Sequence, residues 1–254
     1  MSVVSSPEFS VTLAAGDEDV RAAQRLRYDV FVEELGGGGM MVDHDARLEQ
    51  DRFDPFFDHL ILRDERLDRV VGVYRVMRQD QAVAAGSFYS ASEYDLSPLI
   101  NSGRKLLELG RSCVHRDYRG GGAMFHLWTA LAEYVARHDI EILFGVASFH
   151  GRDANALARP LSLLHHRHLA PSNIRVRAKA SAFQRMDLLP PDTLDARAAM
   201  LEMPSLIKSY LRLGGYVGEG AFIDHAFNTT DVCLILDTET MNKRQARLYQ
   251  KGAG

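Results

Sequence analysis

The chain has 254 residues, of which 46% are hydrophobic and 25% are charged, and its formal net charge at pH 7 is -4. These values are ordinary for a globular protein with a sizeable core; they exclude a disordered chain and give no indication of nucleic-acid binding. Two cysteines cannot form a disulfide framework, and no apolar run approaches the ~18 residues that a membrane-spanning helix needs, so we expect a cytoplasmic protein.

The first half of the chain predicts alternating strands and helices. Gly16 and Asp17 form a helix start signal, and apolar residues recur at helical spacing after it. The expected elements, in chain order, are an edge strand over 9–15, a helix over 18–35, a loop from Gly36 to Met40, and neighbouring strands over 59–63 and 69–78.

The second half continues the same alternation without a Gly/Pro/Ser-rich linker. We expect a central strand over 105–114, a helix over 122–138 and a buried strand over 140–149. Further on, Pro204 starts a helix that Gly214 ends, and residues 231–237 form a buried strand. The pattern predicts a single mixed α/β domain over residues 9–250.

A glycine-rich loop joins the central strand to the helix that follows it. Arg119, Gly120, Gly121, Gly122 and Ala123 lie at this joint. Backbone N–H groups at the start of a helix attract anions, and glycine allows an anion to come close. The same glycines also suit a tight turn, so the motif alone leaves both interpretations open.

Two resemblances follow from these residues. Arg119-x-x-Gly122 resembles the phosphopantetheine-binding loop of the GNAT superfamily of N-acyltransferases, with Met124 at a position that is small in the family. A second set, from position 27 to position 111, resembles the fingerprint of the acyl-homoserine-lactone synthases, a GNAT branch. Its members are Arg27, Phe31, Asp51, Asp54, Arg75, Glu108 and Arg111.

Over roughly residues 9 to 250, the chain is similar to the ornithine lipid synthase N-acyltransferases. The stretches FDHLILR, ELGRSCVHRDYR and the long segment 206–237 carry this resemblance. It implies a GNAT-like acyltransferase fold, with a mixed central sheet flanked by helices and an elaborated C-terminal segment. It also implies transfer of a 3-hydroxyacyl group from acyl carrier protein to the α-amino group of L-ornithine, which gives lyso-ornithine lipid.

Several alternatives stay open at this point. The acceptor could be glutamine, glycine or lysine, or the product could be an acyl-homoserine lactone. A protein of a different class, a catalytically dead GNAT-like sensor of acyl carrier protein, is also compatible with the motifs. Retention of Glu108, Asp51 and Asp54 speaks against that last alternative.

Glu108 is the expected general base, and a structural salt bridge with Arg111 or Arg75 is the alternative. An α-ammonium group must lose a proton before it attacks a thioester, and its pKa of ~8 keeps most of it protonated at neutral pH. Glu108 and Arg111 point to opposite faces of a regular strand, so both can serve one site only if the strand is irregular between them. Gly110 is the expected place for a bulge, and its N–H is a candidate donor to the oxyanion.

Asp51 and Asp54 are expected to combine two roles. Arg27 and Arg75 could pair with them and fix the loop, or the carboxylates could hold the ammonium groups of the acceptor. Arg111 is a candidate for binding an amino acid carboxylate and would fit an ion pair with Asp51 equally well. Phe31 is grouped with Arg27 and Gly110 as a substrate-binding candidate.

Charge is distributed unevenly along the chain. Residues 17–68 contain fifteen acids against seven arginines, whereas residues 154–186 contain six Arg and Lys and no acid. The basic stretch suits the strongly acidic acyl carrier protein, so Arg175, Arg177 and Lys179 are predicted docking residues. The acidic third suits a cationic acceptor such as ornithine.

No protein-bound cofactor and no metal are expected. Direct acyl transfer requires neither, because the donor's acyl group is carried on the 4'-phosphopantetheine of acyl carrier protein. The tract from His165 to His168 has no acid or cysteine nearby to complete a tetrahedral metal site. A helix with an apolar stripe from Leu201 to Leu213 could rest on the inner face of the membrane, or it could pack on the core.

Overall fold

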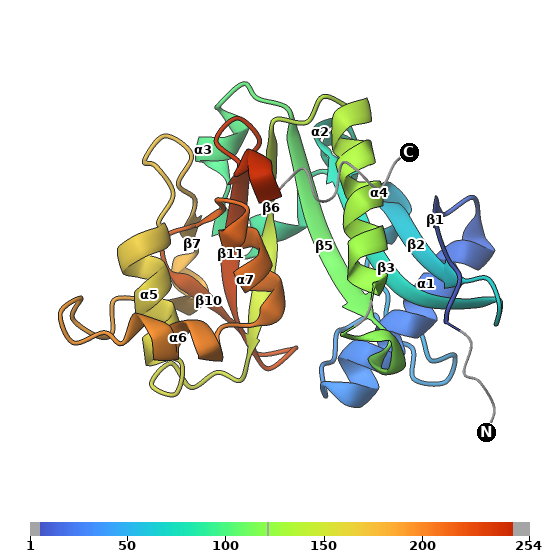
Figure 1. The fold of residues 1–254 in the computed structure, drawn as a ribbon, viewed down its shortest axis with the longest axis horizontal. Coiled ribbons are helices and arrows are strands. Elements are labelled where there is room, and N and C mark those ends of the chain that lie inside the picture. Colours follow the sequence, from blue (N-terminus) through green and yellow to red (C-terminus); the bar gives the residue numbers. More distant parts are fainter. Residues whose placement is uncertain (1–5, 121, 246–254) are drawn as a thin grey trace. The chain divides into compact units, whose positions relative to one another are not determined.

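The computed structural model describes residues 6–120 and 122–245, which form two compact units (Figure 1). The first unit contains residues 6–77 and 110–138, and the second contains residues 78–109 and 139–245. Strand β5 (Leu106–Val114) belongs to both, because the division falls between Leu109 and Gly110. The single domain over residues 9–250 therefore stays a prediction.

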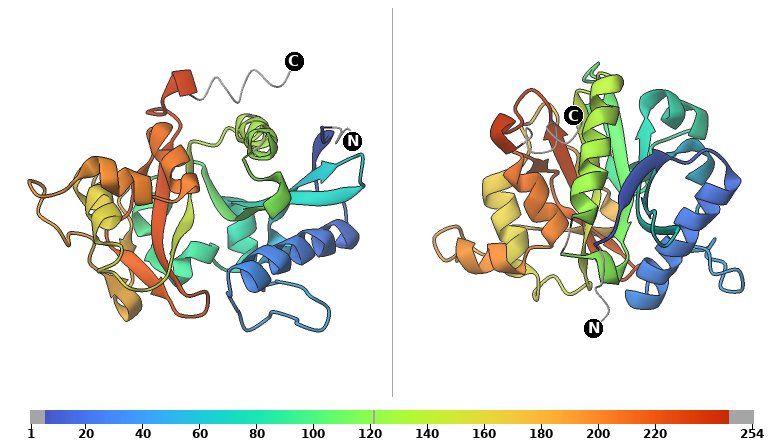
Figure 2. Two further views of the ribbon diagram at one scale, coloured as in Figure 1. Left: turned by 60° about the horizontal axis from the view of Figure 1, so that its bottom comes forward. Right: turned by 45° about the vertical axis from the view of Figure 1, so that its right-hand side comes forward.

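The first unit contains four strands of the sheet with helices on both faces, and its pairs β1–β2 and β2–β3 are antiparallel. Its strand order is β1-β2-β3-β5. Figure 2 shows α1 and α4 on opposite faces of these strands. The elements are β1 (Phe9–Leu13), α1 (Asp17–Arg27), η1 (Tyr28–Glu34), η2 (Asp54–Phe56), β2 (Asp58–Asp64), β3 (Arg69–Arg78), η4 (Arg116–Tyr118) and α4 (Ala123–Arg137).

Apolar residues of α1 hold it against the sheet. Ala23 and Leu26 pack with Ile61 of β2 and Val73 of β3 in one buried cluster. Three acids in the first turn of α1 and two arginines in its last turn complement the helix dipole. On the other face, Gly72 leaves room for Leu127 of α4, since a Cβ on Gly72 would lie 3.1 Å from its Cδ1 atom.

The expected helix over 18–35 changes its geometry part of the way along. Residues from Asp17 to Arg27 are α-helical, and residues from Tyr28 to Glu34 form a π-helix. The Leu35 amide accordingly bonds to the Val30 carbonyl, five residues back, at 3.2 Å. Such wide turns often occur at functional sites.

The second unit contains the rest of the mixed sheet. Its strand order is β5-β6-β11-β10-β8, with β9 on β11; β5 and β6 are parallel and the other pairs are antiparallel. The strands are β4 (Tyr94–Asp95), β6 (Ile142–His150), β7 (Arg177–Ala178), β8 (Phe183–Gln184), β9 (Tyr216–Val217), β10 (Ala221–Asp224) and β11 (Thr229–Asp237). The helices are α2 (Gln79–Ala85), η3 (Tyr89–Ser92), α3 (Ser97–Ile100), α5 (Ala158–His168), η5 (Ala180–Ala182), α6 (Ala196–Glu202) and α7 (Ser205–Arg212). The predicted mixed α/β fold class is confirmed.

The apolar stripe from Leu201 to Leu213 packs mostly on the core. Met203, Ile207, Tyr210 and Leu213 are buried, and α7 contacts β11. Leu201 is exposed, but it belongs to α6 rather than to α7. Of the two alternatives, packing on the core fits these side chains better, and a contact with the membrane stays a prediction. In the described part of the chain, no helix combines the length and apolar composition needed to cross a bilayer.

Candidate active site

A buried ionic cluster gathers five of the predicted site residues in the first unit. Three arginines and three carboxylates form it, from α1, β3, β5 and the loop that leads into η2. They are Arg27, Arg75 and Arg111 with Glu49, Asp51 and Asp54. The formal charges of these six side chains cancel, as a buried set requires.

Asp54 is the centre of the cluster. Its Oδ1 atom lies 2.6 Å from Arg27 Nη1 and 2.6 Å from Arg75 Nη1, and its Oδ2 accepts a hydrogen bond from Gln24 at 2.9 Å. Burial opposes ionisation, but the charges of Arg27 and Arg75 outweigh it and hold the pKa of Asp54 well below its usual range. Asp54 is therefore a permanent anion that fixes the loop to the helix and the sheet.

Asp51 and Arg111 lie at the more accessible side of the cluster. Asp51 receives two hydrogen bonds from Arg75, at 2.9 and 2.6 Å, and Arg111 Nη2 lies 3.3 Å from Asp51 Oδ2. Their side chains are 18% and 14% exposed, against 4% for Asp54. If any members of the cluster contact a substrate, these two are placed better than Asp54.

Glu49 belongs to the cluster and was not singled out from the sequence. Its carboxylate is 1% exposed and binds Arg27 Nε at 2.5 Å and Arg111 Nε at 3.1 Å. Burial raises and the neighbouring guanidinium groups lower the pKa of Glu49, with a net shift below its ordinary value. The available signal was its position two residues before Asp51, in a segment that supplies several partners to the arginines.

Phe31 lies on the π-helix of the first unit. It is partly buried and packs against the apolar cluster that contains Leu26 and Val30. Its predicted role in substrate binding stays a prediction.

Strand β5 has the irregularity that the sequence predicted. Its parallel pairing with β6 covers Leu106, Leu107 and Glu108 and stops there. Arg111 has a left-handed backbone, with a φ of 48°. The turn in the backbone is at Arg111 rather than at Gly110, whose own φ is not positive. The shared use of Glu108 and Arg111 by one site stays a prediction.

Glu108 lies in the second unit and is held by backbone donors. Its carboxylate oxygens accept hydrogen bonds from the Tyr89 amide at 2.7 Å and from the Ser90 amide at 2.6 Å, at the start of η3. The residue is 1% exposed. Amide donors fix the orientation of the carboxylate, which a general base needs, but by stabilising its ionised form they also reduce its basicity.

The described residues of the glycine loop fit an anion site. Gly120 has a φ of 78° and Gly122 is the N-cap residue of α4; among the described residues, no side chain makes a capping hydrogen bond and no acid lies in the first turn of α4. Arg119 and Ala123 flank the glycines as expected, whereas the predicted contact at Gly121 lies outside the described residues. Binding of a donor phosphate at this loop stays a prediction.

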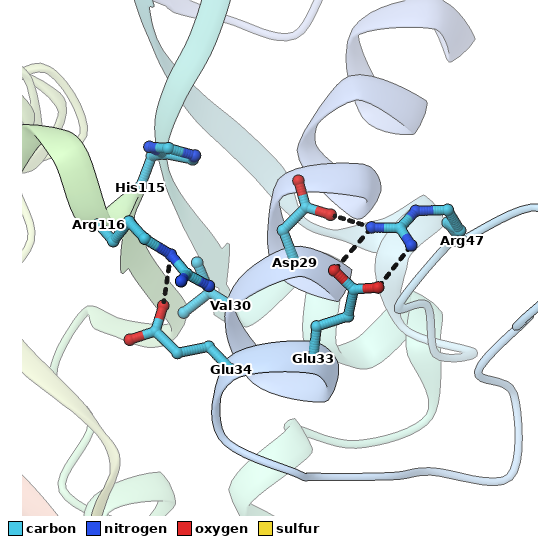
Figure 3. A pocket seen from close by; sticks show the side chains of 7 residues that line it. All are labelled: Asp29, Val30, Glu33, Glu34, Arg47, His115 and Arg116. Atoms are coloured by element: carbon cyan, nitrogen blue, oxygen red, sulfur yellow. Dashed lines mark hydrogen bonds and ion pairs between the residues drawn. The ribbon is translucent and has the colours of Figure 1, made fainter.

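A charged pocket lies beside this loop in the first unit. It is lined by Asp29, Val30, Glu33, Glu34, Arg47, His115 and Arg116. Figure 3 shows Asp29 and Glu33 directed toward Arg47, and Glu34 directed toward Arg116. Glu34 also pairs with Arg119 of the glycine loop.

The predicted docking residues in the basic stretch all have partners. Arg175 Nε donates to the Ala170 carbonyl at 2.7 Å, Arg177 pairs with Glu219, and the Lys179 ammonium donates to the Ala91 carbonyl. The side chains of Arg177 and Lys179 remain exposed. Glu219 balances part of the positive charge, so the acid-free run in the sequence overstates the charge of this surface.

A set of three carboxylates in the second unit is the metal-binding candidate found among residues 6–120 and 122–245. The ligand atoms of Glu93, Asp224 and Asp231 lie within 4.8 Å of one another. Carboxylates suit calcium or magnesium, but three of them alone do not define a site. In the histidine tract, His166 Nε2 contacts the Leu189 carbonyl at 2.9 Å, which is a structural contact.

Neither cysteine has the properties of a catalytic nucleophile. Both are buried, and burial raises the pKa of Cys113 to about 12 and that of Cys233 still further. Acyl transfer through a cysteine thioester is therefore disfavoured, and direct attack by the acceptor amine fits better.

Comparisons with known proteins identify the class. Residues 26–129 match the family model described as "Acetyltransferase (GNAT) domain". The fold is similar to that of the coenzyme-A-dependent acyl-homoserine lactone synthase BjaI, with a TM-score of 0.53 and 15% identity over 97% of this chain and 89% of that one. The fold is thus of the GNAT type, and the matched residues contain all six members of the buried ionic cluster.

Curated relatives give the family within this class. The chain is 59% identical to an L-ornithine N(alpha)-acyltransferase of Rhodobacter capsulatus, over 96% of this chain and 95% of the relative. It is 43% identical to one from Brucella abortus, over 95% of this chain and 88% of the relative. The chain belongs to the L-ornithine N(alpha)-acyltransferase family, which confirms the family resemblance seen in the sequence.

Proposed function

We propose that this protein transfers a 3-hydroxyacyl group from acyl carrier protein to the α-amino group of L-ornithine, which forms lyso-ornithine lipid. The observation that carries the proposal is 59% identity, over nearly the whole chain, to a relative named L-ornithine N(alpha)-acyltransferase. A location in the cytoplasm, where carrier protein and free amino acids are both present, fits this reaction.

Glu108 is the proposed general base. It takes a proton from the α-ammonium group, directly or through a water, and the freed amine attacks the thioester carbonyl. An amide C–N bond forms and the C–S bond breaks. The attacking nitrogen loses a second proton, which passes to the leaving sulfur, so the carrier leaves as a thiol. The Tyr89 and Ser90 amides support this role because they orient the carboxylate.

The accessible members of the ionic cluster are the proposed contacts for the acceptor. Arg111 suits the α-carboxylate of an amino acid, and Asp51 suits the side-chain ammonium that distinguishes ornithine from glutamine and glycine. Arg27, Arg75 and Asp54 hold these two in place. The Gly110 N–H is the proposed donor to the oxyanion of the tetrahedral intermediate.

The glycine loop is the proposed binding site for the donor's phosphate. The uncapped start of α4 and the left-handed Gly120 support this assignment. In this proposal the protein needs no cofactor of its own, because the phosphopantetheine arrives on acyl carrier protein. Arg175, Arg177 and Lys179 are retained as docking candidates for that acidic partner.

Purified protein incubated with 3-hydroxyacyl carrier protein and a panel of amino acids tests the proposal. Ornithine should be acylated faster than glutamine, glycine or lysine. No acyl-homoserine lactone should form when S-adenosylmethionine is offered as the acceptor. Glu108→Gln should lower kcat by about 10² to 10⁴. Equal activity in that variant would remove Glu108 from catalysis, and an inactive wild type that still binds carrier protein would favour a sensor.

A further inference from the structure

Arg119, the positively charged residue of the glycine loop, is bound to the carboxylate of Glu34. Arg119 Nε donates to the Val114 carbonyl at 2.9 Å, and both terminal nitrogens donate to Glu34, with Nη2 at 2.9 Å from Oε2. A guanidinium binds carboxylate and phosphate through the same parallel pair of N–H groups. Glu34 therefore occupies the edge of Arg119 that would otherwise suit a phosphate.

The π-helix brings Glu34 to this position. Glu33 and Glu34 are adjacent, yet Glu33 pairs with Arg47 whereas Glu34 pairs with Arg119 and lies 3.8 Å from Arg116 (Figure 3). The hydrogen bond from Arg119 holds the pKa of Glu34 below its usual range, so the carboxylate is ionised at neutral pH. The adjacent residues Glu33 and Glu34 thus pair with arginines on different sides of the helix.

The pair is accessible enough to respond to an arriving anion. The Arg119 side chain is 43% exposed and that of Glu34 is 22% exposed. A fixed carboxylate at this place repels each phosphate that approaches the loop. Acyl carrier protein presents its pantetheine on a single phosphodiester, whereas coenzyme A carries its pantetheine on a diphosphate and has a 3'-phosphate as well.

We propose that Glu34 determines donor specificity: its charge on Arg119 disfavours coenzyme A thioesters and leaves the singly charged phosphopantetheine arm acceptable. This inference rests on the proposed binding of the donor's phosphate at the glycine loop. It assigns the preference for acyl carrier protein over coenzyme A to the carboxylate of Glu34. The size of Met124 at the start of α4 would act in the same direction.

Binding of free coenzyme A provides the test, with pantetheine as the phosphate-free ligand, and isothermal titration calorimetry as the measurement. Glu34→Gln should bind coenzyme A roughly fivefold more tightly than the wild type, with pantetheine unchanged, and the gain should shrink as salt is added. Glu33→Gln is the matched control, because it removes the same charge from the neighbouring position and should leave coenzyme A binding unchanged.

Kinetics supply a second readout. The ratio of kcat/KM for acyl-coenzyme A to that for acyl carrier protein should rise by roughly the same factor in Glu34→Gln. Glu34→Ala should give the same direction of change, which covers the case in which the amide substitution disturbs folding.

Unchanged coenzyme A binding in both Glu34 variants, or an equal gain in Glu33→Gln, would overturn the role of Glu34. Arg119→Ala separates this failure from a failure of the proposed donor site. If Arg119→Ala weakens coenzyme A binding while the Glu34 variants do not strengthen it, the loop keeps its assignment and only Glu34 loses its role. If Arg119→Ala has no effect either, both assignments fail.

Discussion

The buried ionic cluster and the charged pocket beside the glycine loop contain the same kinds of side chain in the same unit. Asp54 and Arg75 are 4% and 1% exposed, whereas Arg47 and Glu33 are 51% and 43% exposed. A buried ion that loses its partner cannot recover its hydration, but an exposed ion can. The buried members of the cluster therefore stabilise the fold, whereas the paired charges of the pocket remain accessible to approaching ligands.

Removing the central anion of the cluster should have the largest effect. Asp54→Asn leaves Arg27 and Arg75 without their shared carboxylate, and we expect a loss of about 3 to 5 kcal/mol in the free energy of unfolding. Urea denaturation measures this change. Asp29→Asn is the matched control, because Asp29 pairs with the exposed Arg47 and its loss should leave the urea midpoint unchanged. Equal destabilisation by the two variants would remove the distinction between the two regions.

Lowering the pH should reduce the stability that the ionic cluster contributes to the fold. The pKa values of Asp54, Asp51 and Glu49 are lowered in the folded protein, where burial raises them but the arginines outweigh burial. The stability that these groups contribute is therefore complete above their unfolded pKa values near ~4, and it is lost as pH falls toward the folded values.

Urea midpoints between neutral pH and pH ~3 test this dependence. The wild type should lose stability below pH ~4, and Asp54→Asn should show a shallower loss because one linked carboxylate is gone. An identical slope in both proteins would assign the acid sensitivity to other groups.

The smallest effect is expected in the charged pocket. Arg47→Met removes an exposed guanidinium that binds Asp29 and Glu33, and water replaces both contacts. The thermal midpoint should equal that of the wild type within error in differential scanning calorimetry. A clear drop would mean that this exposed pair stabilises the unit as the buried cluster does.

The strongly periodic elements could be predicted from the sequence, because the spacing of apolar residues within each segment is enough to indicate a strand or a helix. The strands around residues 59–63 and 69–78 and the helix after the glycine loop lie within a few residues of the expected bounds. The two-residue strands β4, β7, β8 and β9 could not be predicted, because their pairing depends on distant segments.

The ionic cluster was predicted in part, because motif order identified five of its members. Glu49 was missed, since an acid in an irregular segment gives no sign of burial in the sequence. The partner of Arg177 was missed for a related reason: Glu219 is forty-two positions away. The π-helix was missed because seven residues are too few to distinguish its wider period from that of an α-helix.

The wide turns from Tyr28 to Glu34 set the direction in which Glu34 points. A π-turn holds about one residue more than an α-turn, and each residue of an α-helix turns by about 100°. Each residue of the π-helix therefore turns by less, and the difference accumulates along the segment. If a substitution made the same residues wind as an ordinary α-helix, Glu34 would point away from Arg119 even though its identity had not changed. The winding of this helix is therefore as much a part of the proposed donor site as the glycines themselves.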